Sequence, residues 1–178
     1  MSLAEKIKKV ELLLLDVDGV LTDGSIILGT AELEFKKFNI HDGLGIKLAQ
    51  AAGLQVGIIT GRFSEAVKKR AQELDIKILY QGQEAKLPAY QKIKQQLDLA
   101  DEQIAYIGDD LPDLVILNQV GFSCAVGDAC DEIKKTVDFV TQRNGGRGAV
   151  REVIELILKS QGKWNSLIQN FDLNEKKA

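Results

Sequence analysis

Short apolar segments alternate with segments of helical periodicity along most of the chain. Six apolar runs have the length of strands and are closed by polar residues or glycine. They occupy residues 10–15, 56–59, 76–80, 104–107, 122–126 and 137–140. Helical spacing of apolar positions is found between most of them, at residues 44–52, 65–74, 86–97, 112–120 and 148–158. The alternation predicts a doubly wound, Rossmann-like α/β fold, a parallel sheet with helices on both faces.

Residues 25–40 interrupt this alternation. They predict two short strands, 25–28 and 34–38, joined by a loop through Gly29, and so a β-hairpin flap inserted between the first strand and the first helix. The hairpin carries the apolar side chains Ile26, Ile27, Leu28, Phe35 and Phe38. An isolated two-stranded ribbon cannot bury so many, so we expect a partner surface to cover the flap.

Length and composition narrow the class of protein. With 178 residues and 45% hydrophobic content, one domain over residues 1–178 is expected. A net charge of −3 gives no basic field for nucleic acid, and no apolar run approaches the roughly 18 residues of a membrane span. Two cysteines and no apolar leader favour a cytoplasmic setting. The polar tail, about residues 160–178, is assigned no role.

Polar residues suited to phosphate chemistry follow three of the predicted strands. The first strand ends at Asp16 and Asp18, whose carboxylates lie on one face of an extended chain. Two carboxylates so close together repel each other, so either the pKa of one of them is raised or a cation is required. The remaining candidates are Thr60, Gly61 and Arg62 after the second run, Lys86 at a helix start, and Asp109, Asp110 and Asp113 after the fourth run. Open α/β sheets bind ligands at the carboxyl ends of their strands, so we expect these groups to meet there.

Five motifs together resemble a known family. They are DVDGVLTDG, HDGLGIK, TGR, YIGDD and GGRGA, and the likeness extends from about residue 10 to about residue 157. The chain thereby resembles the haloacid dehalogenase superfamily of phosphohydrolases, and within it the cap-less subfamily. The resemblance implies a Mg²⁺-dependent phosphoric monoester hydrolase that acts on a phosphorylated sugar acid. It also implies a homotetramer in which flaps of neighbouring subunits pack together.

The chemistry of phosphate hydrolysis assigns roles to the motif residues. Asp16 is predicted to attack phosphorus and form an aspartyl-phosphate, and Asp18 to protonate the leaving alkoxide and then activate water. Thr60 and Lys86 would stabilise the transferring phosphoryl group. The resemblance implies that Asp16, the backbone carbonyl of Asp18 and the Asp109 carboxylate hold Mg²⁺, with Asp110 and Asp113 holding bound water. Asp113 has an alternative interpretation as a first-turn carboxylate stabilised by its helix dipole.

Further residues are predicted to bind the substrate. By resemblance, Asn39, His41, Asp42, Gly43 and Lys47 line the pocket with Gly61, and Arg147 closes it, in its own or a neighbouring subunit. Asp42-Gly43 would otherwise be a helix N-cap. Arg62 and Arg70 can pair with a carboxylate or several hydroxyls.

The resemblance favours 3-deoxy-D-manno-octulosonate 8-phosphate as the substrate, which would place the protein in lipopolysaccharide precursor synthesis. The alternative is a phosphatase of a nine-carbon 2-keto-3-deoxy sugar acid 9-phosphate. By resemblance, those enzymes tend to have Glu at the position that Arg62 occupies here, so the eight-carbon substrate is favoured. A non-catalytic oligomerisation module would lack a motif carboxylate, and both are present. A phosphate-accepting receiver domain is disfavoured because Asp18 supplies a dephosphorylating acid/base.

Overall fold

Six parallel strands form the central sheet of the protein, whose computed structural model describes residues 1–30 and 34–175. Their spatial order is β5 (Ile78–Tyr80), β4 (Gln55–Ile59), β1 (Leu12–Leu15), β6 (Ile104–Gly108), β7 (Phe122–Ala125) and β8 (Phe139–Val140). All four residues of β1 are buried, which explains an unbroken run of leucines where a half-exposed strand would alternate. The chain adds β4 and β5 on one side of β1 and then β6 to β8 on the other. The sheet therefore has its topological switch point at β1.

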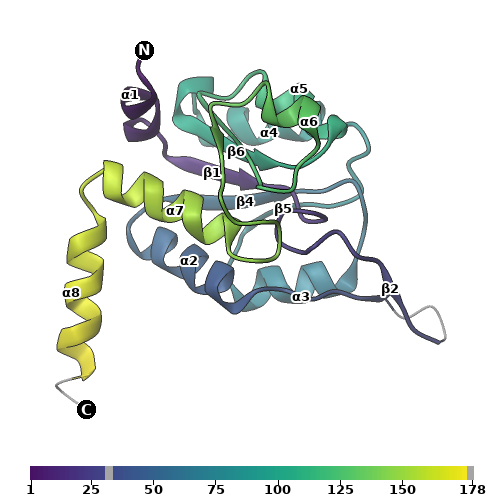
Figure 1. Ribbon diagram of the computed structural model, residues 1–178, viewed down its shortest axis with the longest axis horizontal. Helices are drawn as coiled ribbons and strands as arrows, with labels where there is room; N and C mark the ends of the chain where they lie inside the picture. Colours follow the sequence, from purple (N-terminus) through teal and green to yellow (C-terminus); the bar gives the residue numbers. More distant parts are fainter. Residues whose placement is uncertain (31–33, 176–178) are drawn as a thin grey trace.

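Helices cover both faces of the sheet, as Figure 1 shows. One face carries α2 (Ile40–Ala51), α3 (Glu65–Glu73) and α7 (Ala149–Ser160), and the other carries α4 (Lys86–Leu97), α5 (Leu114–Leu117) and α6 (Asp131–Lys134). The short η1 (Asp101–Gln103) precedes β6, and η2 (Leu111–Asp113) follows it. The predicted fold class is confirmed. Among the described residues, no helix combines the length and apolar character that crossing a membrane requires.

Several helix boundaries differ from the sequence prediction. Helix α2 begins at Ile40 because Asn39 is its N-cap, and the Asn39 side chain accepts a hydrogen bond from the His41 amide at 2.8 Å. The cap is therefore not Asp42-Gly43. The helix expected at 112–120 is replaced by the single turn η2 and the short α5.

Two helices at the ends of the chain were not anticipated. They are α1 (Leu3–Lys8) and α8 (Trp164–Glu175), and α8 extends away from the body of the molecule. Trp164, at the start of α8, lies under the charged groups of Arg151 and Lys159, at 5.1 and 5.3 Å from its ring centre. Such cation–π contacts attach the base of α8 to α7.

The predicted flap is present as a separate antiparallel pair, β2 (Ile27–Leu28) and β3 (Glu34–Phe35), which projects from the body. Its strands are shorter than expected, and the tip of the hairpin lies outside the described residues. Ile26, Ile27, Leu28 and Phe35 are exposed, with 76% of Leu28 accessible. Phe38 differs, because it packs against the core.

The loop that follows β1 is supported by a loop from the far end of the sequence. A Cβ at Gly145 would lie 1.7 Å from the Gly19 carbonyl oxygen, so only glycine permits this approach. The next residue, Gly146, has a φ of +62° and donates its amide to the Val20 carbonyl at 2.9 Å. Residues 145–146 thus fix the backbone that carries the first acidic motif.

Candidate active site

Strand register brings three motif residues to one edge of the sheet. Leu15 of β1 is aligned with Ile58 of β4 and with Ile107 of β6. Asp16 follows its aligned residue by one position, and Thr60 and Asp109 follow theirs by two. All three therefore lie at the carboxyl edge of the sheet. The amide of Asp16 continues the ladder and donates to the Ile107 carbonyl at 3.1 Å. The predicted meeting of these motifs is found at the switch point.

The loop after β1 turns sharply back towards the sheet. The amides of Val20, Leu21 and Thr22 all donate to the Val17 carbonyl, at 2.9–3.2 Å. Gly19 has a φ of +90°, and a Cβ there would come within 2.0 Å of an Asp109 carboxylate oxygen. Glycine is therefore required at this position both by the backbone conformation and by the approach of Asp109. The turn leaves the side chain of Asp18 facing the pocket.

A buried ion-pair network lies beneath the motif residues. The Lys86 ammonium is 2.8 Å from Asp16 and 2.6 Å from Asp113, and all three side chains are less than a tenth exposed. The Tyr106 hydroxyl donates to the same Asp113 oxygen at 2.6 Å and lies 3.3 Å from the Lys86 nitrogen. Burial alone lowers the pKa of Lys86, but the charges of Asp16 and Asp113 outweigh it and the net shift is upward. Lys86 is therefore a permanent cation at the base of the site.

Asp113 also organises the backbone of its own loop. Its second carboxylate oxygen accepts the Asp109 amide at 2.9 Å and the Asp110 amide at 3.4 Å. The Asp110 side chain caps the following turn by accepting the Leu111 amide at 2.8 Å, and Asp110 is exposed. Asp113 is thus more than a first-turn carboxylate stabilised by a helix dipole, because it joins Lys86 to the acidic loop.

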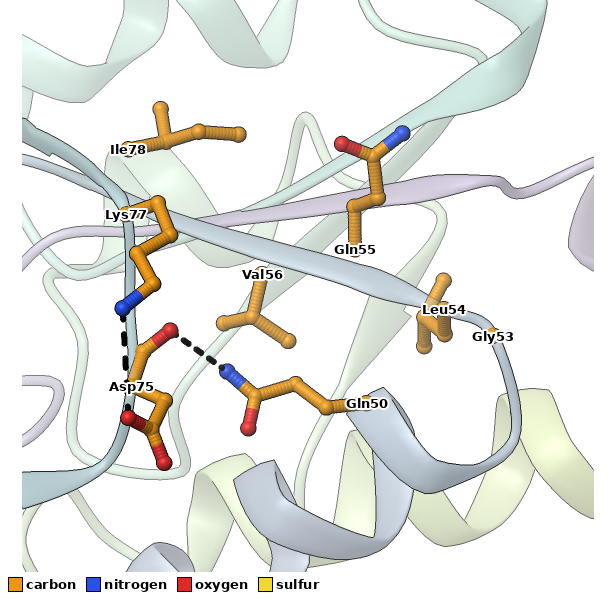
Figure 2. Close-up of a pocket in the computed structure, with 8 residues that line it drawn as sticks. All are labelled: Gln50, Gly53, Leu54, Gln55, Val56, Asp75, Lys77 and Ile78. Carbon is orange, nitrogen blue, oxygen red and sulfur yellow. Dashed lines mark hydrogen bonds and ion pairs between the residues drawn. The ribbon is translucent and has the colours of Figure 1, made fainter.

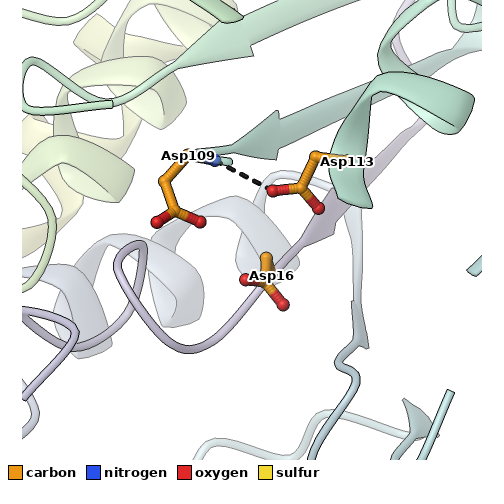
Figure 3. A group of neighbouring side chains, drawn as sticks. All are labelled: Asp16, Asp109 and Asp113. Carbon is orange, nitrogen blue, oxygen red and sulfur yellow. Dashed lines mark hydrogen bonds between the residues drawn. The ribbon is translucent and has the colours of Figure 1, made fainter. Parts of the chain in front are cut away.

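The acidic cluster fits a hard divalent cation. Asp16, Asp109 and Asp113 each offer an oxygen, with these atoms all within 4.8 Å of one another, and Figure 3 shows the three side chains converging. Burial and the nearby charge of Asp113 raise the pKa of Asp16 to about 6, and burial and the charge of Asp16 raise the pKa of Asp109 to about 8. Carboxylates crowded in this way need a cation to stay ionised together, and an all-oxygen donor set suits Mg²⁺. The residues present therefore fit the predicted metal.

An open pocket of about 470 Å³ lies over this cluster, within the range of small-molecule sites. Its lining contains most of the predicted residues together with two unpredicted ones, Glu84 and Pro112. The lining residues are Asp16, Asp18, Thr60, Gly61, Arg62, Glu84, Lys86, Asp109, Asp110, Pro112 and Asp113. The hollow drawn in Figure 2 lies at the opposite edge of the sheet, between the end of α2 and the starts of β4 and β5, and has none of these groups.

The flap contributes charges that sequence reasoning missed. The ammonium of Lys36 pairs with the Asp18 carboxylate and lies 3.3 Å from Glu34. Glu34 accepts a hydrogen bond from the Arg62 guanidinium at 2.6 Å, and Arg62 also comes within 3.9 Å of Asp18. Residues 34 and 36 share one face of an extended strand, while the apolar Phe35 faces the other way. That alternation was the available signal.

Comparison with known proteins identifies the family. A family model of haloacid dehalogenase-like hydrolases matches residues 80–154. The KdsC 3-deoxy-D-manno-octulosonate 8-phosphate phosphatase of Escherichia coli is 48% identical over 158 residues, which cover 89% of this chain and 84% of that protein. The chain belongs to the KdsC phosphatase family. The predicted membership of the haloacid dehalogenase superfamily and the predicted enzyme class, a phosphoric monoester hydrolase, are confirmed.

Solved structures of KdsC phosphatases share the fold over nearly the whole chain. The enzyme from Yersinia pestis superimposes with a TM-score of 0.89 at 45% identity, covering 90% of this chain and 87% of that one. The enzyme from Moraxella catarrhalis, in complex with a magnesium ion, a phosphate ion and a KDO molecule, gives a TM-score of 0.93 at 42% identity, covering 95% and 97%.

The predicted substrate-binding residues of this KdsC family member occupy different places. Gly61 and Arg62 line the pocket, whereas the buried Asp42 carboxylate accepts the amides of Gly148 and Arg151 at the start of α7, at 3.2 and 2.8 Å. Asn39 also reaches that region, donating to the Gly146 carbonyl at 3.3 Å. These two residues join the start of α2 to the loop before α7.

The other predicted binding residues lie beside or away from the pocket. His41 is exposed, and Arg70 lies over Gly43 with its guanidinium 5.9 Å from the Phe38 ring centre. Arg147 is 63% exposed and lies 3.9 Å from Asp23. Lys47 pairs with Asp75 at the opposite edge of the sheet, so it is not brought to this pocket within one chain.

Proposed function

We propose that this protein is a Mg²⁺-dependent phosphatase of 3-deoxy-D-manno-octulosonate 8-phosphate and acts in lipopolysaccharide precursor synthesis. The observation that carries the proposal is the buried Lys86 bridge between Asp16 and Asp113, directly beneath a pocket that Asp18 and Thr60 also line. A permanent cation next to a strand-end carboxylate is what attack on a phosphate dianion requires. Membership of the KdsC family supports the same reaction and substrate.

The residues divide the chemistry between them. An Asp16 oxygen attacks phosphorus, the bond to the leaving oxygen breaks, and Asp18 gives that oxygen a proton. In the second half of the reaction Asp18 takes a proton from water, whose oxygen attacks phosphorus; the bond from phosphorus to the Asp16 oxygen breaks, which releases inorganic phosphate and restores the Asp16 carboxylate. Lys86 and the hydroxyl of Thr60 stabilise the charge on the phosphoryl oxygens.

The carboxylates of Asp16 and Asp109 and the backbone carbonyl of Asp18 would hold Mg²⁺, with Asp113 close by. When bound, the ion neutralises the charge that nucleophile and phosphate bring together. The magnesium ion in the Moraxella catarrhalis enzyme supports this assignment. Asp110, which is exposed at the pocket rim, is assigned to the surrounding water.

The sugar acid is assigned to the mouth of the pocket. Arg62 lies there, 46% exposed, with a planar guanidinium that suits a carboxylate or paired hydroxyls. The KDO molecule in the Moraxella catarrhalis structure supports an eight-carbon acid. Asn39, His41, Gly43, Arg70 and Arg147 are proposed to complete the mouth from the side of the flap and the loop before α7.

A homotetramer in the cytoplasm is proposed for the assembled enzyme. Four apolar side chains of the flap are about half exposed or more, which is a large apolar surface for so small an element. Light scattering on the intact chain should give the mass of a tetramer. Deleting residues 26–37 and bridging the gap with glycine should give smaller species, and a monomeric intact chain would remove this part of the proposal.

The substrate assignment has a direct test. Purified protein with Mg²⁺ is supplied with the eight-carbon 8-phosphate and, separately, with a nine-carbon 2-keto-3-deoxy sugar acid 9-phosphate, and released phosphate is measured. We expect kcat/KM to be higher for the eight-carbon substrate. A preference for the nine-carbon acid would overturn the assignment while leaving the phosphatase mechanism intact.

A further inference from the structure

The flap places a buried lysine against the proposed acid/base. The Lys36 side chain is only 2% exposed, although it leaves a two-stranded hairpin that projects from the body. A lysine is almost never fully buried unless it is paired. Its partners are Asp18 Oδ1 and, at 3.3 Å, Glu34. Because Glu34 is also paired with Arg62, alternating charges connect the flap to the loops that follow β1 and β4.

Among the described residues, the hydrogen bond from Lys36 to Asp18 goes to one oxygen of the carboxylate. The ammonium donates to Oδ1, whereas the Arg62 Nε lies 3.9 Å from Oδ2, beyond hydrogen-bond distance. Asp18 lines the pocket and Lys36 does not. Lys36 is therefore placed to act through Asp18.

We infer that Lys36 is a positioning residue: it holds Asp18 Oδ1, so that Oδ2 is the oxygen that carries the proton to the leaving group. The inference rests on the proposed function, because it assumes that Asp18 is the acid. During the step the proton passes from Oδ2 to the leaving oxygen as its bond to phosphorus breaks. A displacement of about 1 Å of such a group can cost about a hundredfold in rate.

The test compares two small substrates that differ in their need for a proton. The leaving group of a simple alkyl phosphate is a strongly basic alkoxide, which needs a proton. The leaving group of p-nitrophenyl phosphate is the stable p-nitrophenolate, which does not. The value of kcat/KM reports the steps up to formation of the aspartyl-phosphate, which include leaving-group protonation. For Lys36→Met we expect about a tenfold or greater loss with the alkyl phosphate, since general acid catalysis contributes about 10²–10⁴-fold. With the aryl phosphate we expect a change within about twofold, which also shows that the variant folds.

Lys37 offers a matched control on the next residue. It is 57% exposed and pairs with Asp23 at 2.7 Å, so Lys37→Met should change neither value. Lys36→Gln keeps a neutral hydrogen-bond donor on a side chain one bond shorter and should change the alkyl-to-aryl ratio less than Lys36→Met does, which provides a second variant if methionine disrupts the flap. In an Asp18→Asn background, Lys36→Met should add no further loss with the alkyl phosphate.

Three results would overturn the inference. Equal losses with both small phosphates would mean that Lys36 only holds the fold. A loss confined to the sugar acid phosphate would mean that Lys36 binds substrate, and an added loss in the Asp18→Asn background would mean that it acts independently. Failure of the proposed function would give a different result. The wild type would then not prefer the eight-carbon substrate, but Lys36→Met would still affect the alkyl phosphate more than the aryl phosphate.

Discussion

Replacing Tyr106 with phenylalanine tests the buried network with the loss of a single oxygen atom. Burial and the charge of Asp113 raise the pKa of Tyr106 well above its usual value, so its hydroxyl is a protonated donor at any working pH. Tyr106→Phe removes the 2.6 Å hydrogen bond to Asp113 and leaves the packing of the ring unchanged. Asp113 keeps Lys86 at 2.6 Å and the Asp109 amide at 2.9 Å, so the variant does not create an unpaired buried charge.

The size of the effect follows from these contacts. A hydrogen bond to a charged group contributes about 1.5–3 kcal/mol, and the remaining partners of Asp113 prevent a larger loss. For a chain of this length, each kcal/mol corresponds to about 2–4 °C in Tm, so we expect Tm to fall by about 3–12 °C. Thermal unfolding followed by circular dichroism, with chelator present so that metal binding does not add to stability, measures the change.

Tyr80→Phe on β5, at the edge of the sheet, is the control. The Tyr80 hydroxyl donates to Gln96 at 3.1 Å in an exposed position, so its loss should stay within about 0.5 kcal/mol. If Tyr106→Phe and Tyr80→Phe lowered Tm equally, the Tyr106 hydroxyl would not stabilise Asp113, and the argument that Tyr106 belongs to the buried network would fail.

Four further changes test other parts of the site. Asp16→Asn should abolish metal-dependent phosphate release with Tm little changed, and appreciable turnover would refute the covalent mechanism. Excess chelator should stop turnover, which Mg²⁺ should restore and Ca²⁺ should not, because its larger, looser coordination shell misplaces the nucleophile; full activity in chelator would contradict this. Arg62→Gln should lower kcat/KM for the eight-carbon substrate about tenfold or more, the value of one charge-assisted contact, and spare p-nitrophenyl phosphate. Asp42→Ala should lower the free energy of unfolding in urea by about 2 kcal/mol through loss of the cap of α7, and an unchanged midpoint would show that the cap contributes nothing.

For the test at position 62, we choose Arg62→Gln and not Arg62→Glu because of the contacts between Arg62 and the flap. Arg62 pairs with Glu34 and lies near Asp18, so a glutamate there would repel both carboxylates. A charge reversal would then disturb the acid/base as well as the pocket mouth. A neutral side chain separates substrate binding from that disturbance.

The strand-end residues could be predicted from the sequence because their placement follows from local rules. A buried strand is a short apolar run, and the polar residues that close it lie at the carboxyl edge of a parallel sheet. Asp16, Thr60 and Asp109 meet for this reason. The pairing of Lys86 with both Asp16 and Asp113 needed the distances, since a lysine at a helix start is ordinarily solvated.

Other residues could not be assigned because their partners are distant in sequence. Tyr106 lies in an apolar strand, where an aromatic residue is ordinarily a core residue, and only the fold brings Asp113 and Lys86 to its hydroxyl. Lys36 and Lys37 are adjacent and chemically identical, yet one is buried against Asp18 and the other is exposed. Lys47 is similar, because its pairing with Asp75 depends on how α2 lies beside the end of α3.

The contact between Gly145 and Gly19 has a consequence for folding of the chain during its synthesis on the ribosome. All four catalytic motifs have been synthesised by residue 113, yet the loop of the first motif lacks its support until residues 145–146 have left the exit tunnel. Contacts of such long sequence separation form late in folding, because the chain between them must first be ordered. We therefore expect a nascent chain that ends before residue 145 to carry every reacting group without the contacts that support the loop of the first motif. We therefore expect catalytic competence to depend on the emergence of residues 145–146.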